Sequence, residues 1–364
     1  MTKRLLVMAG GTGGHIFPGI AVARELQQQG WQIHWLGTAA RMEAQLVPKA
    51  GFDISYIDVA GVRGNGIIRL LKAPFAILKS IWQAKAVIRD FQPDAVLGMG
   101  GFASGPGGVA AWLMRVPLVV HEQNAIAGMT NKILSRFAKY VLSGFENSQI
   151  ASSHVEWVGN PVRDEFAQVP TKTQIDTRVS TNILVVGGSL GAKCLNEHVP
   201  KAIAALAKQH GGKLHIRHQS GQQHHASVTS VYEAIVNKQA NWQVHEFIDD
   251  MVAAYDWADV IICRAGALTV AEVAAAGRCA IFVPLPHAVD DHQTWNARAL
   301  VDQQAALLLS QTELEQGNLL PTLTALLADH EKVEMMSSNA KTLAKLDATN
   351  AVANVCTKAA GMTS

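Results

Sequence analysis

Three glycine-rich segments of the chain have the composition of phosphate-binding loops. Residues 10–15 are Gly-Gly-Thr-Gly-Gly-His, residues 187–191 are Gly-Gly-Ser-Leu-Gly, and residues 98–108 contain six glycines. Such a turn lets backbone N–H groups approach phosphate oxygens, and the N-terminus of a following helix adds about half a positive charge. A single loop could equally be a tight turn that serves packing, but three in one chain favour a phosphorylated ligand.

These segments differ from the two commonest nucleotide-binding motifs. The first is not G-x-G-x-x-G, and the next predicted strand ends at Gly37 and Thr38 without an acidic residue for a nicotinamide ribose, which disfavours an NAD-dependent dehydrogenase. Residues 187–191 lack the lysine of a P-loop, which disfavours a P-loop NTPase. The chain has no Asp-x-Asp, so we expect helix termini and basic or hydroxyl side chains, rather than a dedicated divalent metal, to neutralise a bound diphosphate.

Two polar segments of the second half could complete a nucleotide-sugar site. Residues 264–272 place Thr269 at a predicted helix start, where it suits phosphate. Glu272 suits two ribose hydroxyls, or it forms a capping box with Thr269. Residues 287–296 follow a predicted buried strand and are dense in hydrogen-bonding side chains, which fits either a sugar site or a solvated loop.

The elements that would position these segments alternate between strands and helices. Strand-like runs occupy residues 5–9, 32–36, 54–59, 95–98 and 118–121, then 183–186, 214–218, 243–246, 260–263 and 280–284. This alternation is typical of parallel sheets with crossover helices. We therefore predict an α/β fold of two Rossmann-like domains, residues 1–160 and 161–340, with a helix in residues 341–364 that packs back toward the first. Ligands bind beyond the carboxyl ends of such strands, so the two domains are expected to face each other across a cleft.

Composition and charge limit the class of protein. The 364 residues are 49% hydrophobic and 16% charged, which suits a two-domain globular enzyme. Four scattered cysteines without a C-x-x-C pair favour neither a zinc site nor a disulfide framework and fit a reducing cytoplasm. Residues 1–160 carry 15 Lys and Arg against 9 Asp and Glu, whereas residues 161–364 carry 16 against 20. The first half is therefore expected to face an anionic partner, and sparse aromatic residues give nucleic-acid binding little support.

One predicted helix carries an apolar stripe with basic edges. The stripe consists of Leu71, Phe75, Leu78 and Trp82, spaced at i, i+4, i+7 and i+11, and Lys72 and Lys79 are among the flanking residues. Such a stripe fits the surface of an anionic membrane, while a core-facing helix face is the ordinary alternative. Trp112 is a further candidate for the same patch.

Seven motifs, taken together, identify a family. They are residues 10–15, 98–101, 121–124 (His-Glu-Gln-Asn), 159–163 (Gly-Asn-Pro-Val-Arg), 187–189, 264–269 and the segment with Asp291, Gln293 and Asn296. In order and spacing, over nearly the whole chain, they closely resemble the MurG-type N-acetylglucosaminyltransferases of bacterial peptidoglycan synthesis. The resemblance implies a GT-B fold, in which the N-terminal domain takes the lipid-linked acceptor, lipid I, and the C-terminal domain takes UDP-N-acetylglucosamine.

The resemblance also implies a set of site residues. The donor-binding residues would be Thr12, Gly13, Gly14, Asn124, Arg163, Ser189, Ile248, Ala267, Leu268, Thr269, Val270, Ala271, Glu272 and Gln293. The acceptor pyrophosphate would meet Gly13, Gly14, His15, Gly100, Gly101 and Ser104. Ile248 would meet the uracil through its backbone, Glu272 would hold the ribose, and Asn124 and Gln293 would hold the sugar. Neither Asp290 nor Asp291 can be assigned a ligand contact.

The implied reaction is an inverting displacement that needs no metal ion or cofactor. The 4-hydroxyl of the acceptor N-acetylmuramoyl unit attacks the anomeric carbon of the donor, UDP leaves, and a β-1,4 bond forms, giving lipid II. Such a step needs a base near the hydroxyl. His15, with an ordinary pKa of about 6.5, is the candidate, or it only positions the acceptor. Glu122 is the rival base, or it braces its own loop.

Location, partners and competing functions also follow from the resemblance. A peripheral protein on the cytoplasmic side of the bacterial inner membrane is expected, with anionic lipids and cell-wall assembly proteins as further partners. A UDP-N-acetylglucosamine 2-epimerase or another glycolipid synthase of the same fold is the alternative enzyme. A non-catalytic module that binds nucleotide-sugars or lipid carriers is the alternative from another class, and UDP release with and without acceptor would distinguish them.

Overall fold

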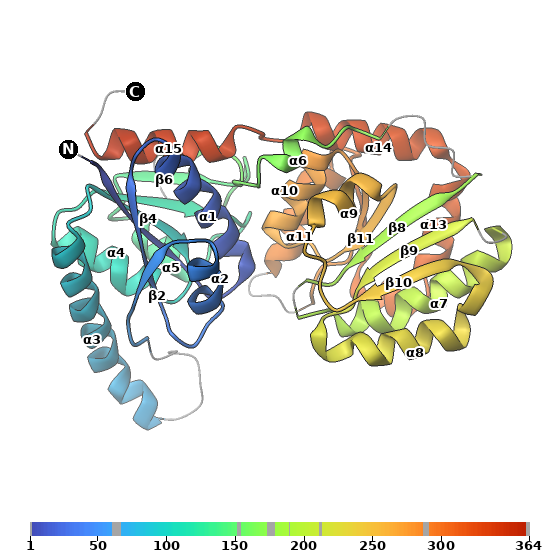
Figure 1. Cartoon of the computed structure of the whole chain (residues 1–364), viewed down its shortest axis with the longest axis horizontal. Helices are drawn as coiled ribbons and strands as arrows, with labels where there is room; N and C mark the ends of the chain where they lie inside the picture. The colour runs from blue at the N-terminus through green and yellow to red at the C-terminus, as the bar shows by residue number, and fades with distance from the viewer. Residues whose placement is uncertain are drawn as a thin grey trace. The chain divides into compact units, whose positions relative to one another are not determined.

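The chain folds into two compact units, each with its own parallel sheet (Figure 1). The computed structural model describes residues 2–59, 67–150, 154–172, 179–188, 190–210, 213–286 and 291–361, with side chains omitted at 67–73, 210 and 237. The first unit comprises Met1–Arg163 and Lys345–Ser364, and the second comprises Asp164–Ala344. The chain passes into the second unit after Arg163 and back into the first after Ala344, so the last helix belongs to the first unit.

The sheet of the first unit has seven parallel strands in the order β3-β2-β1-β4-β5-β6-β7. Their bounds are β1 Arg4–Ala9, β2 Gln32–Gly37, β3 Asp53–Tyr56, β4 Ala95–Gly100, β5 Leu118–Glu122, β6 Tyr140–Ser143 and β7 Val155–Trp157. The first five confirm the strands predicted from the sequence, and β6 and the edge strand β7 were not predicted. Because the sheet is covered on both faces, its central strands are continuous apolar runs.

Helices cover both faces of this sheet. They are α1 Gly13–Gln28, α2 Glu43–Lys49, α3 Ile67–Phe91, α4 Ser104–Leu113, α5 Met129–Leu134 and α15 Ala348–Ala359. Leu5 and Val7 of β1 pack with α1 and α15, whereas Leu6 and Met8 pack with α3, α4 and α5. This alternation follows from the two-residue period of a strand. The last helix and the first lie side by side, red beside blue in Figure 1.

The second unit repeats the plan with six parallel strands in the order β10-β9-β8-β11-β12-β13. The strands are β8 Thr181–Val186, β9 Leu214–Gln219, β10 Asn241–His245, β11 Val260–Cys263, β12 Cys279–Phe282 and β13 Leu307–Leu308. The helices are α6 Glu165–Gln168, α7 Lys193–His210, α8 His225–Ile235, α9 Met251–Trp257, α10 Ala267–Ala276, α11 His292–Val301, α12 Gln311–Glu315, α13 Leu319–Ala328 and α14 His330–Thr342. Five of the six strands confirm the prediction, and the two-residue β13 was not predicted.

Each glycine segment lies where a strand passes into a helix, at the carboxyl end of its sheet. Residues 10–12 join β1 to α1, residues 101–103 join β4 to α4, and residues 187–192 join β8 to α7. This is the edge at which doubly wound sheets bind ligands. Among the described residues, no helix is long and apolar enough to cross a membrane.

Candidate functional site

In the first unit, the glycine segment at residues 10–15 contacts the glycine segment at residues 98–108. The N–H of Gly10 donates to the carbonyl oxygen of Gly100 at 3.3 Å. Gly101 has a φ of 94°, and a Cβ atom there would overlap the backbone of Gly10, so only glycine fits. The first backbone bond of α1 joins His15 to Thr12 at 3.1 Å, so the amides of Gly13 and Gly14 precede the hydrogen-bonded helix. Such amides at a helix N-terminus suit an anion.

The side chain of His15 extends from the start of α1 toward the glycine segment at residues 98–108. Its Nδ1 lies 3.1 Å from the carbonyl oxygen of Gly10 and 3.4 Å from Oγ1 of Thr12. A carbonyl oxygen can only accept, so Nδ1 carries the proton in the neutral ring and Nε2 is the basic nitrogen. A Cβ atom on Gly100 would lie 3.1 Å from that Nε2, so the basic edge of the ring faces the Gly100 backbone.

A carboxylate that the sequence analysis missed supports the first glycine segment. Glu43 is 1% exposed and accepts from the N–H of Gly11 at 2.9 Å. It also accepts from the N–H and hydroxyl of Thr38, at 3.1 and 2.6 Å. A Cβ on Gly10 would lie 2.6 Å from Glu43 Oε1, so this glycine makes room for the carboxylate. Glu43 therefore holds the loop in place through these hydrogen bonds. No motif or spacing in the sequence indicates this role.

The side chain of Ser104, a predicted contact of the acceptor pyrophosphate, points into the core. It is fully buried, and its hydroxyl lies 2.9 Å from the carbonyl oxygen of Met8 and 2.7 Å from that of Gly100. The single O–H proton is shared between these two carbonyls, which joins β1 to β4. The hydroxyl therefore braces the loop and is turned away from any ligand surface.

Glu122 at the end of β5 braces its own loop. The side chain is 2% exposed. Its Oε1 accepts from the N–H and Nδ2 of Asn124, at 2.9 and 3.2 Å, and its Oε2 accepts from the N–H of Gly128 and Nδ2 of Asn131, at 3.0 and 2.9 Å. Four donors thus occupy both oxygens, which favours the bracing alternative over the role of rival base. The same bonds orient Asn124, a predicted sugar contact.

The segment that precedes the first crossing between the units is anchored by a buried histidine. His121 Nε2 lies 2.9 Å from the carbonyl oxygen of Gly159, and burial lowers the pKa of His121 to about 4, so the ring is neutral at pH 7. Asn160 Nδ2 donates to the carbonyl oxygen of Gln123 at 3.0 Å. These contacts tie the segment before Arg163, the last residue of the first unit before the chain enters the second, to the end of β5.

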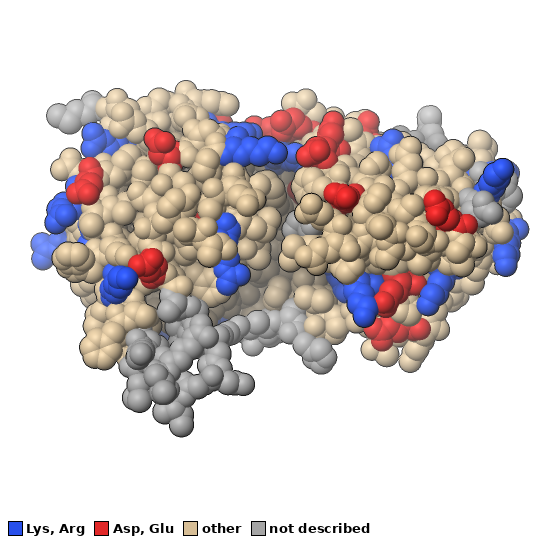
Figure 2. Space-filling model, turned by 60° about the horizontal axis from the view of Figure 1, so that its bottom comes forward, with Lys and Arg blue, Asp and Glu red and all other residues tan. Residues whose placement is uncertain are grey.

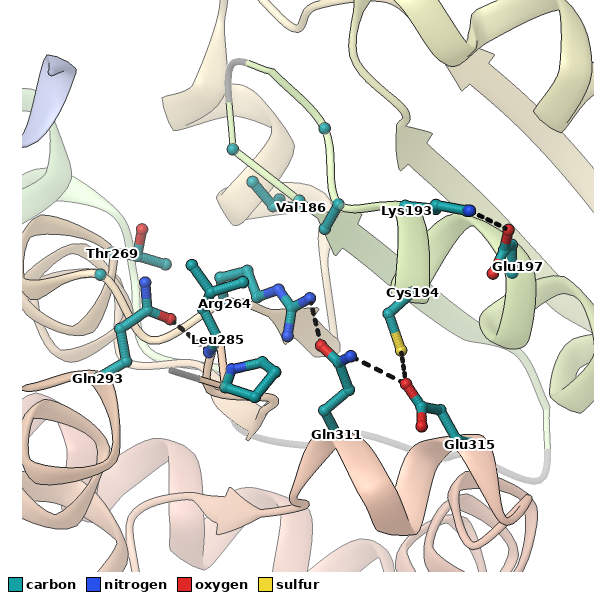
Figure 3. Close-up of a pocket in the computed structure, with 16 residues that line it drawn as sticks. Val186, Lys193, Cys194, Glu197, Arg264, Thr269, Leu285, Gln293, Gln311 and Glu315 are labelled. Carbon is teal, nitrogen blue, oxygen red and sulfur yellow. Dashed lines mark hydrogen bonds and ion pairs between the residues drawn. The ribbon is translucent and has the colours of Figure 1, made fainter. Parts of the chain in front are cut away.

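The second unit contains a cavity of about 630 Å³ at the carboxyl end of its sheet (Figure 3). It is lined by Val186, Gly187, Gly188, Gly191, Ala192, Lys193, Cys194, Glu197, Arg264, Gly266, Thr269, Leu285, Pro286, Gln293, Gln311 and Glu315. The N-termini of α7 and α10 both border it, together with the side chains of Lys193 and Arg264. Two helix termini and two cations around one cavity suit a diphosphate. Ser189 lies outside the described residues.

The start of α10 excludes the capping-box interpretation of Thr269 and Glu272. The N-cap is Gly266, without a side-chain cap, and the first backbone bond joins Val270 to Gly266 at 3.0 Å. The amides of Ala267, Leu268 and Thr269 therefore precede the hydrogen-bonded turns, as an anion site requires. Val270 and Ala271 follow in the next turn. Glu272 follows directly in the same turn, with its Oε2 3.5 Å from the hydroxyl of Tyr255.

Gln293 on α11 is oriented by a backbone contact. Its Oε1 accepts from the N–H of Leu285 at 2.9 Å, so its Nε2 group is the part available to donate toward the cavity, as Figure 3 shows. A donated hydrogen bond suits a sugar hydroxyl oxygen. Asp291 accepts from the hydroxyl of Thr294 at 2.8 Å at the start of the same helix, and Asp290 lies outside the described residues.

A chain of hydrogen-bonded polar side chains lines part of the cavity. Arg264 Nη1 donates to the carbonyl oxygens of Val283 and Pro284, at 3.1 and 3.0 Å, and its Nη2 donates to Gln311 Oε1 at 2.9 Å. Gln311 in turn donates to Glu315 at 2.9 Å (Figure 3). Burial lowers the pKa of Arg264. These hydrogen bonds therefore hold the guanidinium of Arg264 at the cavity and tie the end of β12 to α12.

The apolar stripe of α3 does not face the core. Phe75, Leu78 and Trp82 are 75, 63 and 76% exposed, while Ala84 and Ile88 on the same helix are buried. The core-facing interpretation is therefore wrong for these three residues. The side chains of Leu71 and Lys72 lie outside the described part, and Lys79 forms an ion pair with Asp58 at 2.8 Å. On the face in Figure 2, Lys and Arg are interspersed with neutral and acidic side chains on both units.

Both units match models of one glycosyltransferase family. Residues 5–143 match the glycosyltransferase family 28 N-terminal domain, and residues 182–352 match the family 28 C-terminal domain. A relative from Pseudoalteromonas atlantica, named UDP-N-acetylglucosamine--N-acetylmuramyl-(pentapeptide) pyrophosphoryl-undecaprenol N-acetylglucosamine transferase, is 57% identical over 98% of this chain and 95% of its own length. The chain belongs to the MurG-type N-acetylglucosaminyltransferases.

Solved structures agree with this membership. The crystal structure of MurG from Acinetobacter baumannii is 45% identical and superposes with a TM-score of 0.81, covering 98% of this chain and 99% of that one. A UDP-GlcNAc 2-epimerase from Neisseria meningitidis, bound to UDP-GlcNAc, superposes with a TM-score of 0.69 over 98% of this chain and 100% of that one, at 16% identity. That likeness shows the fold alone, so the epimerase alternative is not favoured. The predicted α/β fold of two Rossmann-like domains and the assignment as a glycosyltransferase of the MurG type are confirmed.

Proposed function

We propose that the chain transfers N-acetylglucosamine from UDP-N-acetylglucosamine to lipid I and so forms lipid II in peptidoglycan synthesis. The observation that carries this function is the 57% identity to the Pseudoalteromonas atlantica transferase over 98% of the chain, which spans both units. The cavity of the second unit supports the donor class, because two helix N-termini and two cations fit a nucleotide diphosphate.

The donor would be held by groups of different chemistry, some that line this cavity and others from neighbouring elements of the second unit. The amides of Ala267, Leu268 and Thr269 would bind the diphosphate, and Gln293 Nε2 would donate to a sugar hydroxyl. Glu272, beside Tyr255, would accept from the ribose hydroxyls, and Ile248 would meet the uracil. We expect no divalent metal or cofactor, since the helix N-termini and the cations that border the cavity could neutralise the phosphate charge.

In the first unit, His15 would act as the base of an inverting reaction. Its hydrogen bond to Gly10 leaves Nε2 as the basic nitrogen, next to amides of two glycine segments that would bind the acceptor pyrophosphate. Nε2 would take the proton of the 4-hydroxyl as that oxygen bonds to the anomeric carbon. UDP would leave with the electron pair of the broken bond, and a β-1,4 linkage would form.

The exposed stripe of α3 would hold the enzyme at a membrane. Three large apolar side chains in one stripe are more than the scattered exposure usual on a soluble surface. A lipid-linked acceptor requires work at a bilayer, and the cytoplasmic face of the inner membrane, with its anionic lipids, is the surface where this substrate and a nucleotide-sugar donor would meet. Cell-wall assembly proteins would be further partners there.

Transfer of radiolabelled sugar to a short-chain lipid I analogue, with EDTA present, tests the proposal. A β-linked disaccharide product would establish donor, acceptor, inversion and metal independence. Glu272→Ala and Gln293→Ala should weaken donor binding and transfer, whereas Glu331→Ala, an exposed change on α14, should alter neither. Conversion of UDP-N-acetylglucosamine without acceptor would indicate an epimerase, and binding without any reaction would indicate a binding module.

A further inference from the structure

The end of β9 carries a buried amide that touches two loops at once. Gln219 is 1% exposed. Its Nε2 donates to the carbonyl oxygen of Gly188 at 3.0 Å, and its Oε1 accepts from the N–H of Ile248 at 2.9 Å. Because β9 lies between β8 and β10 in the sheet, this one side chain joins the loops that follow its two neighbours.

The two loops have different tasks in the proposed donor site. Gly188 belongs to the glycine segment that lines the cavity and leads into α7. Ile248 lies between β10 and α9, beyond the point where Ser220 fixes the end of β10 by donating to the carbonyl oxygen of His245 at 2.9 Å. Gln219 therefore adds an attachment three residues further along that loop. A nucleoside diphosphate with its base at Ile248 and its phosphates at the cavity would have to span both loops.

We infer that Gln219 is a positioning residue that sets the spacing between the Ile248 segment and the Gly188 loop, so that a nucleoside diphosphate spanning both is bound more tightly than a nucleoside touching one. This inference rests on the proposed function, which places the nucleobase at Ile248. A glutamine amide suits the task because one planar group offers a donor and an acceptor, and burial removes the competition of water. Since the Ile248 N–H already donates to Gln219, the Ile248 carbonyl oxygen is the group that would accept from the uracil N3–H.

The test compares a ligand that spans both loops with one that does not. Gln219→Met keeps the side-chain length and removes both hydrogen bonds. We expect its dissociation constant for UDP, measured by titration calorimetry on the full chain, to rise about tenfold to a hundredfold, in line with the loss of two buried hydrogen bonds. Uridine, measured by competition with UDP, should change about twofold or less, since either loop alone can still adapt to its part of a ligand.

A second variant and a matched control separate this role from a general loss of stability. Gln219→Glu keeps the acceptor for Ile248 and, in its ionised form, has no donor for Gly188. Because burial raises the pKa of a carboxyl group, the selective loss of UDP binding relative to the wild type is expected to grow as the pH is raised from 6 to 9. Asn182→Leu removes a comparable amide at the opposite end of β8, where Asn182 Nδ2 donates to the carbonyl oxygen of Trp257 at 3.1 Å. That control should leave both ligand affinities unchanged even if it lowers the melting temperature.

The outcomes are distinct. A selective loss of UDP affinity in a folded Gln219 variant supports the inference. Equal losses for UDP and uridine, or an unchanged UDP affinity, overturn it and leave Gln219 a purely structural residue. If Gln219→Met does not fold, the comparison in Gln219→Glu decides. A wild-type chain that binds no UDP would overturn the proposed function itself, and the inference with it.

Discussion

The ring of His15, the proposed general base, is held by a hydrogen bond to its own loop. Its Nδ1 donates to Gly10 at 3.1 Å, so the ring presents a basic Nε2. Loss of a general base typically costs about a hundredfold to ten-thousandfold in rate. We therefore expect His15→Ala to lower kcat by about a hundredfold or more with little change in the KM for UDP-N-acetylglucosamine, measured by steady-state kinetics with a short-chain acceptor. His330→Ala, at the start of α14, should change neither constant, and equal losses in kcat and donor affinity would make His15 a positioning residue.

Glu122→Gln should damage a loop rather than a chemical step. The substitution turns one of two fully used acceptor oxygens into an NH₂ group that faces other donors. We expect the free energy of unfolding to fall by about 1–3 kcal/mol, and the donor KM to rise because Asn124 loses its support, while kcat changes by less than about tenfold. Urea unfolding and steady-state kinetics measure these effects. A hundredfold loss of kcat in an equally stable variant would restore Glu122 as a candidate base.

Two buried histidines make stability depend on pH, one in each unit. Burial lowers the pKa of His121 to about 4 and that of His218 to about 3, against about 6.5 in an unfolded chain. Below pH 6.5 the unfolded state binds more protons, so this contribution to stability is complete above that pH and is lost as the pH falls toward the folded values. From pH 6.5 to 5 we expect each unit to lose about 2 kcal/mol of unfolding free energy. Urea midpoints at pH 7 and pH 5 measure this, and equal midpoints would contradict it.

At the scale of elements, the helix α3 separates an exposed apolar stripe, the proposed membrane surface, from a core face. Each large apolar side chain that enters a lipid phase contributes about 1.5–3 kcal/mol, so Phe75→Ser and Trp82→Ser should each weaken binding to phosphatidylglycerol vesicles about tenfold or more in a flotation assay. Activity on a short-chain, water-soluble acceptor should be unchanged. Met335→Ser removes an apolar residue of α14 that is 43% exposed and should not affect vesicle binding. Undiminished flotation of both α3 variants would remove the membrane role of this stripe.

The same helix shows which elements the sequence could predict. Its period of 3.6 residues was evident, but Phe75 and Ile88 are both apolar, and only the partners in α4 and the sheet decide which one is buried. The central strands were predicted because both their faces are covered, which leaves continuous apolar runs. The short edge strands β7 and β13 carry too few residues for a pattern and depend on pairing with β6 and β12.

Residues that connect elements were the ones that spacing could not identify. Glu43 and Gln219 are single polar residues, and their roles arise from loops that come together only in the fold. Glycine segments, in contrast, were visible in the sequence because a glycine is required wherever two backbones touch, as at Gly101. The ligand-binding edge of each sheet was therefore predictable, whereas the side chains that hold its loops in place were not.

At the scale of the whole molecule, the two units should unfold in separate transitions, since each has its own core. The last helix belongs to the first unit. Val352 of α15 is fully buried among residues of β1, β4 and α1. Val352→Asp would place an unpaired carboxylate there, at a cost of several kcal/mol. We expect calorimetry to show one transition shifted to lower temperature and the other unchanged, with transfer activity lost while UDP binding remains, because the residues that line the donor cavity lie in Asp164–Ala344. Asn354→Asp, an exposed change on the same helix, should leave both transitions in place. If both transitions shift together in Val352→Asp, the units fold as one cooperative body, and the independence of the donor domain is refuted.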